Sequence, residues 1–151
     1  MGHTQQALKL LIVEDCHDTA CSTAQLVELD GHRARIAYCA EDALALAALE
    51  PPDVVLLDVR LPRINGDEVA RCLRHLNSPK PPMIIAISGS TSESDRRKME
   101  EAGCHLYLLK PVDPVVVIGI LRRFQRATQT CEMDETPIDT YRFHRMLPTF
   151  A

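Results

Sequence analysis

Four residues whose side chains can do chemistry stand directly after hydrophobic runs. A run of four hydrophobic residues precedes Asp58, another precedes the pair Glu14 and Asp15, and a third precedes Lys110. Such runs are typical of buried strands in parallel sheets, and ligands bind outside the carboxyl ends of those strands. We therefore expect the three carboxylates and the ammonium group to share one crevice.

The residue types in this crevice favour phosphoryl chemistry with Mg²⁺. Crowded carboxylates raise each other's proton affinity, so a cation should join them, and oxygen ligands suit Mg²⁺. Lys110 can pair with Asp58 and later with a phosphoryl oxygen, and Ser88, after a fourth hydrophobic run, adds a hydroxyl group. An aspartate can accept a phosphoryl group covalently, and the transfer needs mainly positioning and charge neutralisation.

The elements that must position these residues follow from the hydrophobic pattern. Five hydrophobic runs alternate with amphipathic helical segments, which predicts an α/β protein with a doubly wound parallel sheet and five flanking helices. The expected strands cover residues 8–14, 33–38, 53–58, 83–88 and 105–110. The expected helices begin after Asp18, at Glu41, at Gly66, at Ser92 and at Pro114.

Capping chemistry predicts where several of these helices begin and end. Asp18 is the expected N-cap of the first helix and Asp113 that of the fifth. Gly31 and Gly103 are the expected stops of the first and fourth helices, because glycine readily adopts a positive φ. Cations suit the end of a helix, so the last turn of the fifth helix is expected to carry Arg122, Arg123 and Arg126.

Length and composition indicate one domain. The chain has 151 residues, of which 46% are hydrophobic, and a formal net charge of -4. We expect a folded domain over residues 8–127 and a tail or truncated linker over residues 128–151. The acidic balance disfavours nucleic-acid binding. The longest apolar stretch, residues 115–121, is shorter than the roughly 18 residues that a membrane helix needs, so we expect a cytoplasmic protein without a membrane span.

The six cysteines form no C-x-x-C pair and are predicted to be small buried apolar groups. A zinc site of Cys104, His105, Cys131 and His144 matches no ligand spacing, and we set it aside. His17, beside the acidic pair, is expected to be a loop residue rather than a metal ligand.

These landmarks resemble the receiver domain of two-component response regulators over roughly residues 8–127. The acidic pair, the segment D-V-R-L-P-R-I-N-G from Asp58, Ser88 in I-S-G-S, and Tyr107 before Lys110 occur in the order of that family. The intervals also agree, with 30 residues from Asp58 to Ser88 and 52 from Asp58 to Lys110. The resemblance implies a flavodoxin-like sheet with strand order 2-1-3-4-5.

The resemblance implies a role for each residue of the crevice. Asp58 would accept a phosphoryl group from a phosphohistidine on a histidine kinase or a histidine phosphotransfer protein. Lys110 and Ser88 would bind the phosphoryl oxygens. The Mg²⁺ ligands would be Asp15, Asp58 and the main-chain carbonyl of Arg60, with Glu14 reaching the ion through water. Such a protein is a phosphoacceptor signalling domain, not an enzyme.

The resemblance also implies a switch. Ser88 would shift toward the phosphoryl group and Tyr107 would turn inward, which changes the face formed by the fourth helix, the fifth strand and the fifth helix. A second copy of the chain or an output partner would bind that face. The bond between Lys110 and Pro111 would be a cis peptide. Arg60 and Ser90 occupy positions that tune loss of the phosphoryl group in the family, and Arg60 would either shield the aspartyl phosphate or point into water.

Alternative functions remain open at the level of sequence. The chain is either a stand-alone receiver or the receiver segment of a larger protein such as a hybrid histidine kinase. Two alternatives have the same fold. The charged residues would form a structural ion cluster at the end of the sheet, or the domain would be a binding scaffold that is not phosphorylated. An aspartate-nucleophile phosphatase usually has a second aspartate two residues after the nucleophile, and Arg60 at that position argues against this class.

Overall fold

The computed structural model describes residues 5–76 and 80–132, with side chains to residue 129. The chain divides into two compact units, one of residues 8–112 and one of residues 1–7 and 113–151.

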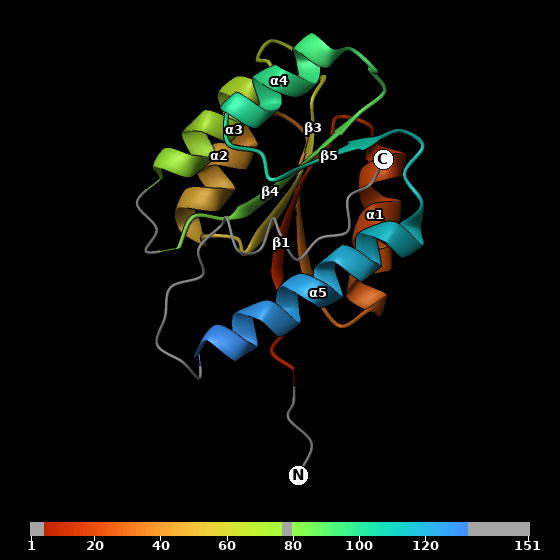
Figure 1. The fold of residues 1–151 in the computed structure, drawn as a ribbon, viewed down its shortest axis with the longest axis vertical. Helices are drawn as coiled ribbons and strands as arrows, with labels where there is room; N and C mark the ends of the chain where they lie inside the picture. Colours follow the sequence, from red (N-terminus) through yellow and green to blue (C-terminus); the bar gives the residue numbers. More distant parts are fainter. Residues whose placement is uncertain (1–4, 77–79, 133–151) are drawn as a thin grey trace. The chain divides into compact units, whose positions relative to one another are not determined.

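The larger unit contains a parallel sheet of five strands (Figure 1). In chain order the strands are β1 (Lys9–Val13), β2 (Arg33–Ala37), β3 (Val54–Asp58), β4 (Met83–Ser88) and β5 (Leu106–Leu109). Their order in the sheet is β2-β1-β3-β4-β5, which confirms the expected α/β class and strand order. The central strand β3 is buried at all five residues, as its uninterrupted hydrophobic run predicts.

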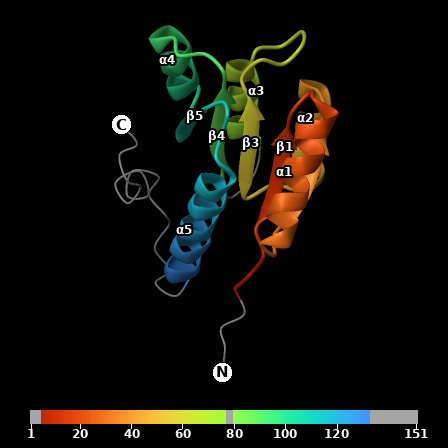
Figure 2. The same cartoon turned by 90° about the vertical axis from the view of Figure 1, so that its right-hand side faces the viewer.

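Four helices of this unit flank the sheet. They are α1 (His17–Leu29), α2 (Ala40–Leu49), α3 (Gly66–His75) and α4 (Glu93–Glu101). Figures 1 and 2 show α1 on one face of the sheet and α2, α3 and α4 on the other. The second face contains the main apolar core, in which Leu11, Val55 and Leu57 of the sheet join Leu73 of α3 and Met99 of α4.

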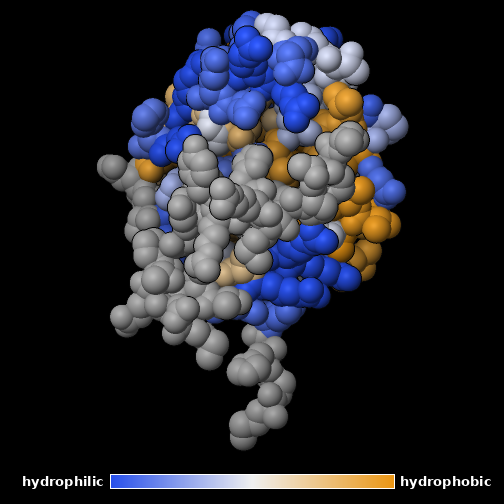
Figure 3. Space-filling model, viewed as in Figure 1, coloured by the Kyte–Doolittle hydropathy of each residue, from blue (hydrophilic) through white to orange (hydrophobic). Residues whose placement is uncertain are grey.

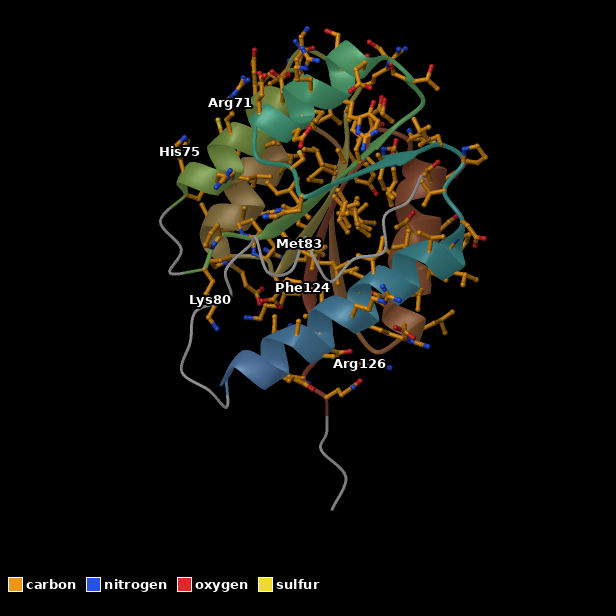
Figure 4. The ribbon with its side chains drawn as sticks, viewed as in Figure 1. Arg71, His75, Lys80, Met83, Phe124 and Arg126 are labelled. Carbon is orange, nitrogen blue, oxygen red and sulfur yellow. The ribbon has the colours of Figure 1, made fainter. Side chains whose placement is uncertain are left out.

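Each helix on this face buries one side and exposes the other. In α3, Val69 and Leu73 are buried, whereas Arg71 and His75 point away from the sheet (Figure 4). In α4 only Met99 is buried, and Figure 3 shows hydrophilic side chains gathered over this helix. A helix with such a narrow apolar stripe is held by few packing contacts.

The predicted helix boundaries are partly confirmed. Gly31 and Gly103 follow α1 and α4 with φ of 91° and 99°, as expected for glycine stops. The prediction of Asp18 as an N-cap is wrong, because α1 begins at His17 with Cys16 as its N-cap. The Cys16 N–H donates to Glu14 Oε1 (3.2 Å), which turns the chain into the helix earlier than expected. His17 is therefore a helix residue, not a loop residue.

The burial predicted for the cysteines is also wrong for the five whose side chains the structure describes, and the side chain of Cys131 lies outside that part of the chain. Cys16, Cys21 and Cys72 are exposed, and Cys39 and Cys104 are half-buried. Cys21 and Cys72 lie on the outward sides of α1 and α3, whose inner sides are filled by alanine, valine and leucine. The hydrophobicity of a residue does not by itself determine which side of a helix that residue occupies.

The smaller unit contains α5 (Pro114–Glu132). Asp113 Oδ1 accepts a hydrogen bond from the Val115 N–H (2.9 Å), so the predicted cap is confirmed. The prediction that Arg126 lies in the last turn is wrong, since the helix continues to Glu132. After Pro114 the sequence has no proline until Pro137, and the residues after Arg126 contain no glycine that would stop a helix.

Candidate functional site

The carboxyl ends of four strands bring the predicted site residues together. Asp58 and Ser88 are the last residues of β3 and β4, Glu14 and Asp15 follow β1, and Lys110 follows β5. Each of the three acidic residues offers a carboxylate oxygen, and these oxygens lie within 4.8 Å of one another. Glu14 and Asp58 are buried, with exposed fractions of 7% and 5%, whereas Asp15 is exposed. The carboxylates of Glu14, Asp15 and Asp58 therefore lie close together, as expected.

Lys110 provides the positive charge of this cluster. Its Nζ lies 3.3 Å from Asp58 Oδ2 and 3.7 Å from Glu14 Oε2. Its backbone N–H donates to the Ser88 carbonyl oxygen (2.8 Å), and its bond to Pro111 is cis, as expected. Burial alone would lower the pKa of Lys110, but the carboxylates of Asp58 and Glu14 together raise it, so the ammonium group stays charged.

Glu14 has a raised carboxyl pKa. Burial, and next the charge of Asp58, raise the pKa of Glu14 to about 7, although the Cys16 N–H and Lys110 act in the opposite direction. A carboxyl group that is still protonated near neutral pH becomes a negatively charged carboxylate when a cation binds, because the cation displaces its proton. Glu14, Asp15 and Asp58 together form the oxygen-only donor set that suits Mg²⁺.

The loop after β3 fixes the orientation of Asp58. Asp58 Oδ1 accepts a hydrogen bond from the Arg60 N–H (3.0 Å), which leaves Oδ2 to face Lys110. The loop returns at Gly66, whose N–H donates to the Val59 carbonyl oxygen (3.1 Å). A Cβ atom on Gly66 would lie 2.8 Å from Val59 Cα, so the close approach requires glycine. Sequence reasoning treated Gly66 only as the start of a helix.

The loop after β4 connects the two expected switch residues. Ser88 is buried, and its Oγ accepts a hydrogen bond from the Ser90 N–H (3.0 Å). The Tyr107 hydroxyl donates to the carbonyl oxygen of the same Ser90 (3.1 Å). The Ser90 hydroxyl in turn donates to Asp95 Oδ2 in α4 (2.7 Å). Sequence reasoning named Ser90 without this connection and assigned no role to Asp95.

The edge of the site near β2 carries an aromatic contact. The rings of His17 and Tyr38 are stacked, with centroids 3.9 Å apart and planes at 10°. Among the described residues, the group of possible metal-binding side chains contains Glu14, Asp15 and Asp58, and the expectation that His17 is not a ligand stays a prediction.

Comparison with known proteins decides the family of this fold and site. Residues 10–122 match the model of the response regulator receiver domain. The chain belongs to the response regulator receiver family. It is similar to the response regulator MprA of Mycobacterium sp. strain KMS, with 31% identity over 89% of this chain. An uncharacterized 14.6 kDa protein of Leptolyngbya boryana is 30% identical over 80% of this chain.

Solved structures agree with this assignment. The CheY-like receiver domain protein of Methanospirillum hungatei superposes with a TM-score of 0.76 and 26% identity, covering 83% of this chain and 98% of that one. The receiver spans 92% of the Leptolyngbya protein but only 57% of MprA, so it corresponds to about half of the MprA relatives. Receivers are signalling domains that bind Mg²⁺ at an acidic pocket and act with histidine kinases. Among the described residues, no helix is both long and apolar enough to span a membrane.

Proposed function

We propose that this receiver accepts a phosphoryl group on Asp58 from a phosphohistidine of a histidine kinase or a histidine phosphotransfer protein, in a Mg²⁺-dependent reaction. The observation that carries the proposal is the position of Asp58. One of its oxygens is held by the Arg60 N–H, the other faces Lys110, and two further carboxylates lie beside it. This arrangement presents an Asp58 oxygen as the nucleophile and places the Lys110 ammonium group beside it. The neighbouring carboxylates offer oxygen ligands to Mg²⁺.

The cluster residues would divide the work of the transfer. Asp15, Asp58 and the main-chain carbonyl of Arg60 would hold Mg²⁺, with Glu14 bound through water, and the ion would neutralise charge on the phosphoryl oxygens. An Asp58 oxygen forms the new O–P bond as the N–P bond of the phosphohistidine breaks, and the electron pair of that bond stays on the imidazole nitrogen. Lys110, whose Nζ lies 3.3 Å from Asp58 Oδ2, would exchange this contact for one with a phosphoryl oxygen, because its side chain is flexible.

The transfer would then change the surface of the domain. The Ser88 hydroxyl would bind a phosphoryl oxygen and Tyr107 would turn inward, which alters the expected signalling face of α4, β5 and α5. A second copy of the chain or an output partner would bind this face, as the resemblance implies. The domain extent of residues 8–127, with residues 128–151 as a tail or linker, and the cytoplasmic location stay predictions.

A mass measurement tests the proposal. The intact protein is incubated with Mg²⁺ and acetyl phosphate or phosphoramidate, alongside Asp58→Ala and the control Asp42→Asn, which changes an exposed carboxylate of α2. We expect one phosphoryl adduct in the parent and in the control and none in Asp58→Ala. An adduct that persists in Asp58→Ala would assign the acceptor to another residue. A protein that binds neither Mg²⁺ nor phosphoryl would be a binding scaffold.

A further inference from the structure

Ser90 is the meeting point of a hydrogen-bond network that joins the site to α4. Its N–H donates to Ser88 Oγ (3.0 Å), and its carbonyl oxygen accepts from the Tyr107 hydroxyl (3.1 Å). Its hydroxyl donates to Asp95 Oδ2 (2.7 Å) and accepts from the Ser92 N–H (3.2 Å). Every polar atom of Ser90 therefore has a partner, and two of these partners are the expected switch residues.

The Asp95 end of this network is anchored in the helix. Asp95 lies in the first turn of α4, and its own N–H donates to the N-cap hydroxyl of Ser92 (3.4 Å). The buried side chain of Met99 fixes α4 in the core. Hydrogen bonds to a carboxylate are stronger than those between neutral groups, so the 2.7 Å bond from Ser90 to Asp95 is the firmest polar attachment of the loop.

We infer that the hydrogen bond between Ser90 and Asp95 is a latch that holds Ser88 and Tyr107 in their resting positions, and that Asp95 is a positioning residue which sets how readily the site accepts a phosphoryl group. The inference rests on the proposed function. Asp95 would thus help to control phosphorylation of the site, although it lies outside the acidic crevice.

The mechanism of the latch follows from the bonds of Ser90. For the Ser88 hydroxyl to move toward a phosphoryl group on Asp58, it must either give up the Ser90 N–H or take Ser90 with it. If Ser90 moves, its bonds to Asp95, Ser92 and Tyr107 are lost or rearranged. The latch therefore stabilises the resting state. For a ligand that selects the other state, the apparent Kd equals the intrinsic Kd divided by the fraction of molecules in that other state, so the latch weakens binding.

Binding of beryllofluoride, a tetrahedral phosphoryl analogue, measures this effect by calorimetry in saturating Mg²⁺. Asp95→Ala should bind beryllofluoride about fivefold more tightly than the parent, which corresponds to the net contribution of one hydrogen bond. Asp95→Asn keeps an acceptor oxygen without the charge and should lie between the two. The affinity for Mg²⁺ alone should not change, because Asp95 is not among the clustered carboxylates.

Ser90 variants identify the bond itself. Ser90→Ala should also strengthen beryllofluoride binding, and adding Asp95→Ala to it should give no further gain, since both changes remove the same contact. Ser90→Thr keeps the hydroxyl group and should restore the parent affinity. A fluorine label on Tyr107 should report a larger shifted population in the variants at a given beryllofluoride concentration.

The matched control is Glu93→Ala, which removes the same charge from the same turn of α4 but leaves the acceptor of the Ser90 hydroxyl in place. An equal gain in Glu93→Ala and Asp95→Ala would overturn the latch and assign the effect to the helix. Unchanged or weaker beryllofluoride binding in Asp95→Ala, with normal binding by the parent, would also overturn it. A parent protein that binds Mg²⁺ but neither beryllofluoride nor phosphoryl would instead overturn the proposed function and the latch with it.

Discussion

Lys110 Nζ lies 3.3 Å from Asp58 Oδ2, although the two residues are 52 positions apart in sequence. Asp58 ends β3 and Lys110 follows β5, and these two strands are separated by β4. The lysine reaches across the end of β4 because its backbone is itself bound to that strand, through the bond from the Lys110 N–H to the Ser88 carbonyl oxygen (2.8 Å). The charge pair is therefore held by the edge of the sheet and not by flexible loops alone.

Asp58→Asn should stabilise the protein without Mg²⁺. The substitution relieves the repulsion that contributes to the raised pKa of Glu14, and the amide oxygen can still accept the Arg60 N–H. We expect the free energy of unfolding in urea with EDTA to rise by about 1 kcal/mol. Glu100→Gln, which changes an exposed carboxylate of α4, is the control and should have little effect. A decrease in stability for Asp58→Asn would show that its pairing with Lys110 outweighs the repulsion.

Lys110→Met should lower the stability of the Mg²⁺-free protein at pH 8. The substitution leaves two buried carboxylates without their cation, and we expect a loss of about 1 kcal/mol, since the lysine side chain is 39% exposed. Lys9→Met removes an exposed pair with Glu50 and should cost less. Urea unfolding of both variants measures the difference, and equal losses would mean that the central pair is no stronger than a surface pair.

Binding of Mg²⁺ should strengthen as pH rises toward 7. The folded protein holds a proton on Glu14 up to a pKa of about 7, whereas the ordinary value is 4.5, so folded molecules bind more protons than unfolded ones between these values. This group therefore makes the metal-free protein less stable as pH rises from 4.5 to 7, and Mg²⁺ must displace its proton.

Calorimetry should show the Mg²⁺ affinity rising by on the order of tenfold between pH 5.5 and pH 7.5. Glu14→Gln, which cannot titrate, should flatten the profile. If the profile of Glu14→Gln is as steep as that of the parent, another group holds the proton.

Gly66→Ala should damage both the fold and the Mg²⁺ site. The new Cβ would lie 2.8 Å from Val59 Cα, which forces the loop that contains Arg60 to move. We expect a loss of about 1–3 kcal/mol in unfolding free energy and weaker Mg²⁺ binding. Gly119→Ala is the control, because nothing lies within 4 Å of its Cβ position and it lies within α5, where alanine is stabilising by roughly 0.5–1 kcal/mol. Similar thermal unfolding of the two variants would contradict the steric argument.

The strands and the acidic crevice could be predicted because they follow from local sequence. The runs before Asp58 and Lys110 are hydrophobic at every position, and a parallel sheet places their ends at one edge. Each predicted strand except β4 was too long by one or two residues, because a residue at the end of a hydrophobic run belongs to the strand or to the loop depending on its backbone bonds. The end of α5 was missed because nothing in the sequence stops the helix at residue 127.

The network around Ser90 could not be predicted in the same way. The fourth helix was expected to begin at Ser92, and in the structure Ser92 is the N-cap of α4, which begins one residue later at Glu93. The partner of Asp95, however, depends on where the loop after β4 places Ser90. That position depends in turn on Tyr107 in a different strand, which only the folded chain brings close.

The sparse packing of α4 bears on how receivers of this kind can diversify. Apart from Met99, this helix is attached to the rest of the domain mainly by surface residues, and Asp95 is one of them. Duplicated copies of such a gene can therefore come to differ in how readily they accept a phosphoryl group, through substitutions in the first turn of α4. The acidic residues and Lys110 would be inherited unchanged, so the response of each copy would evolve separately from its phosphoryl chemistry.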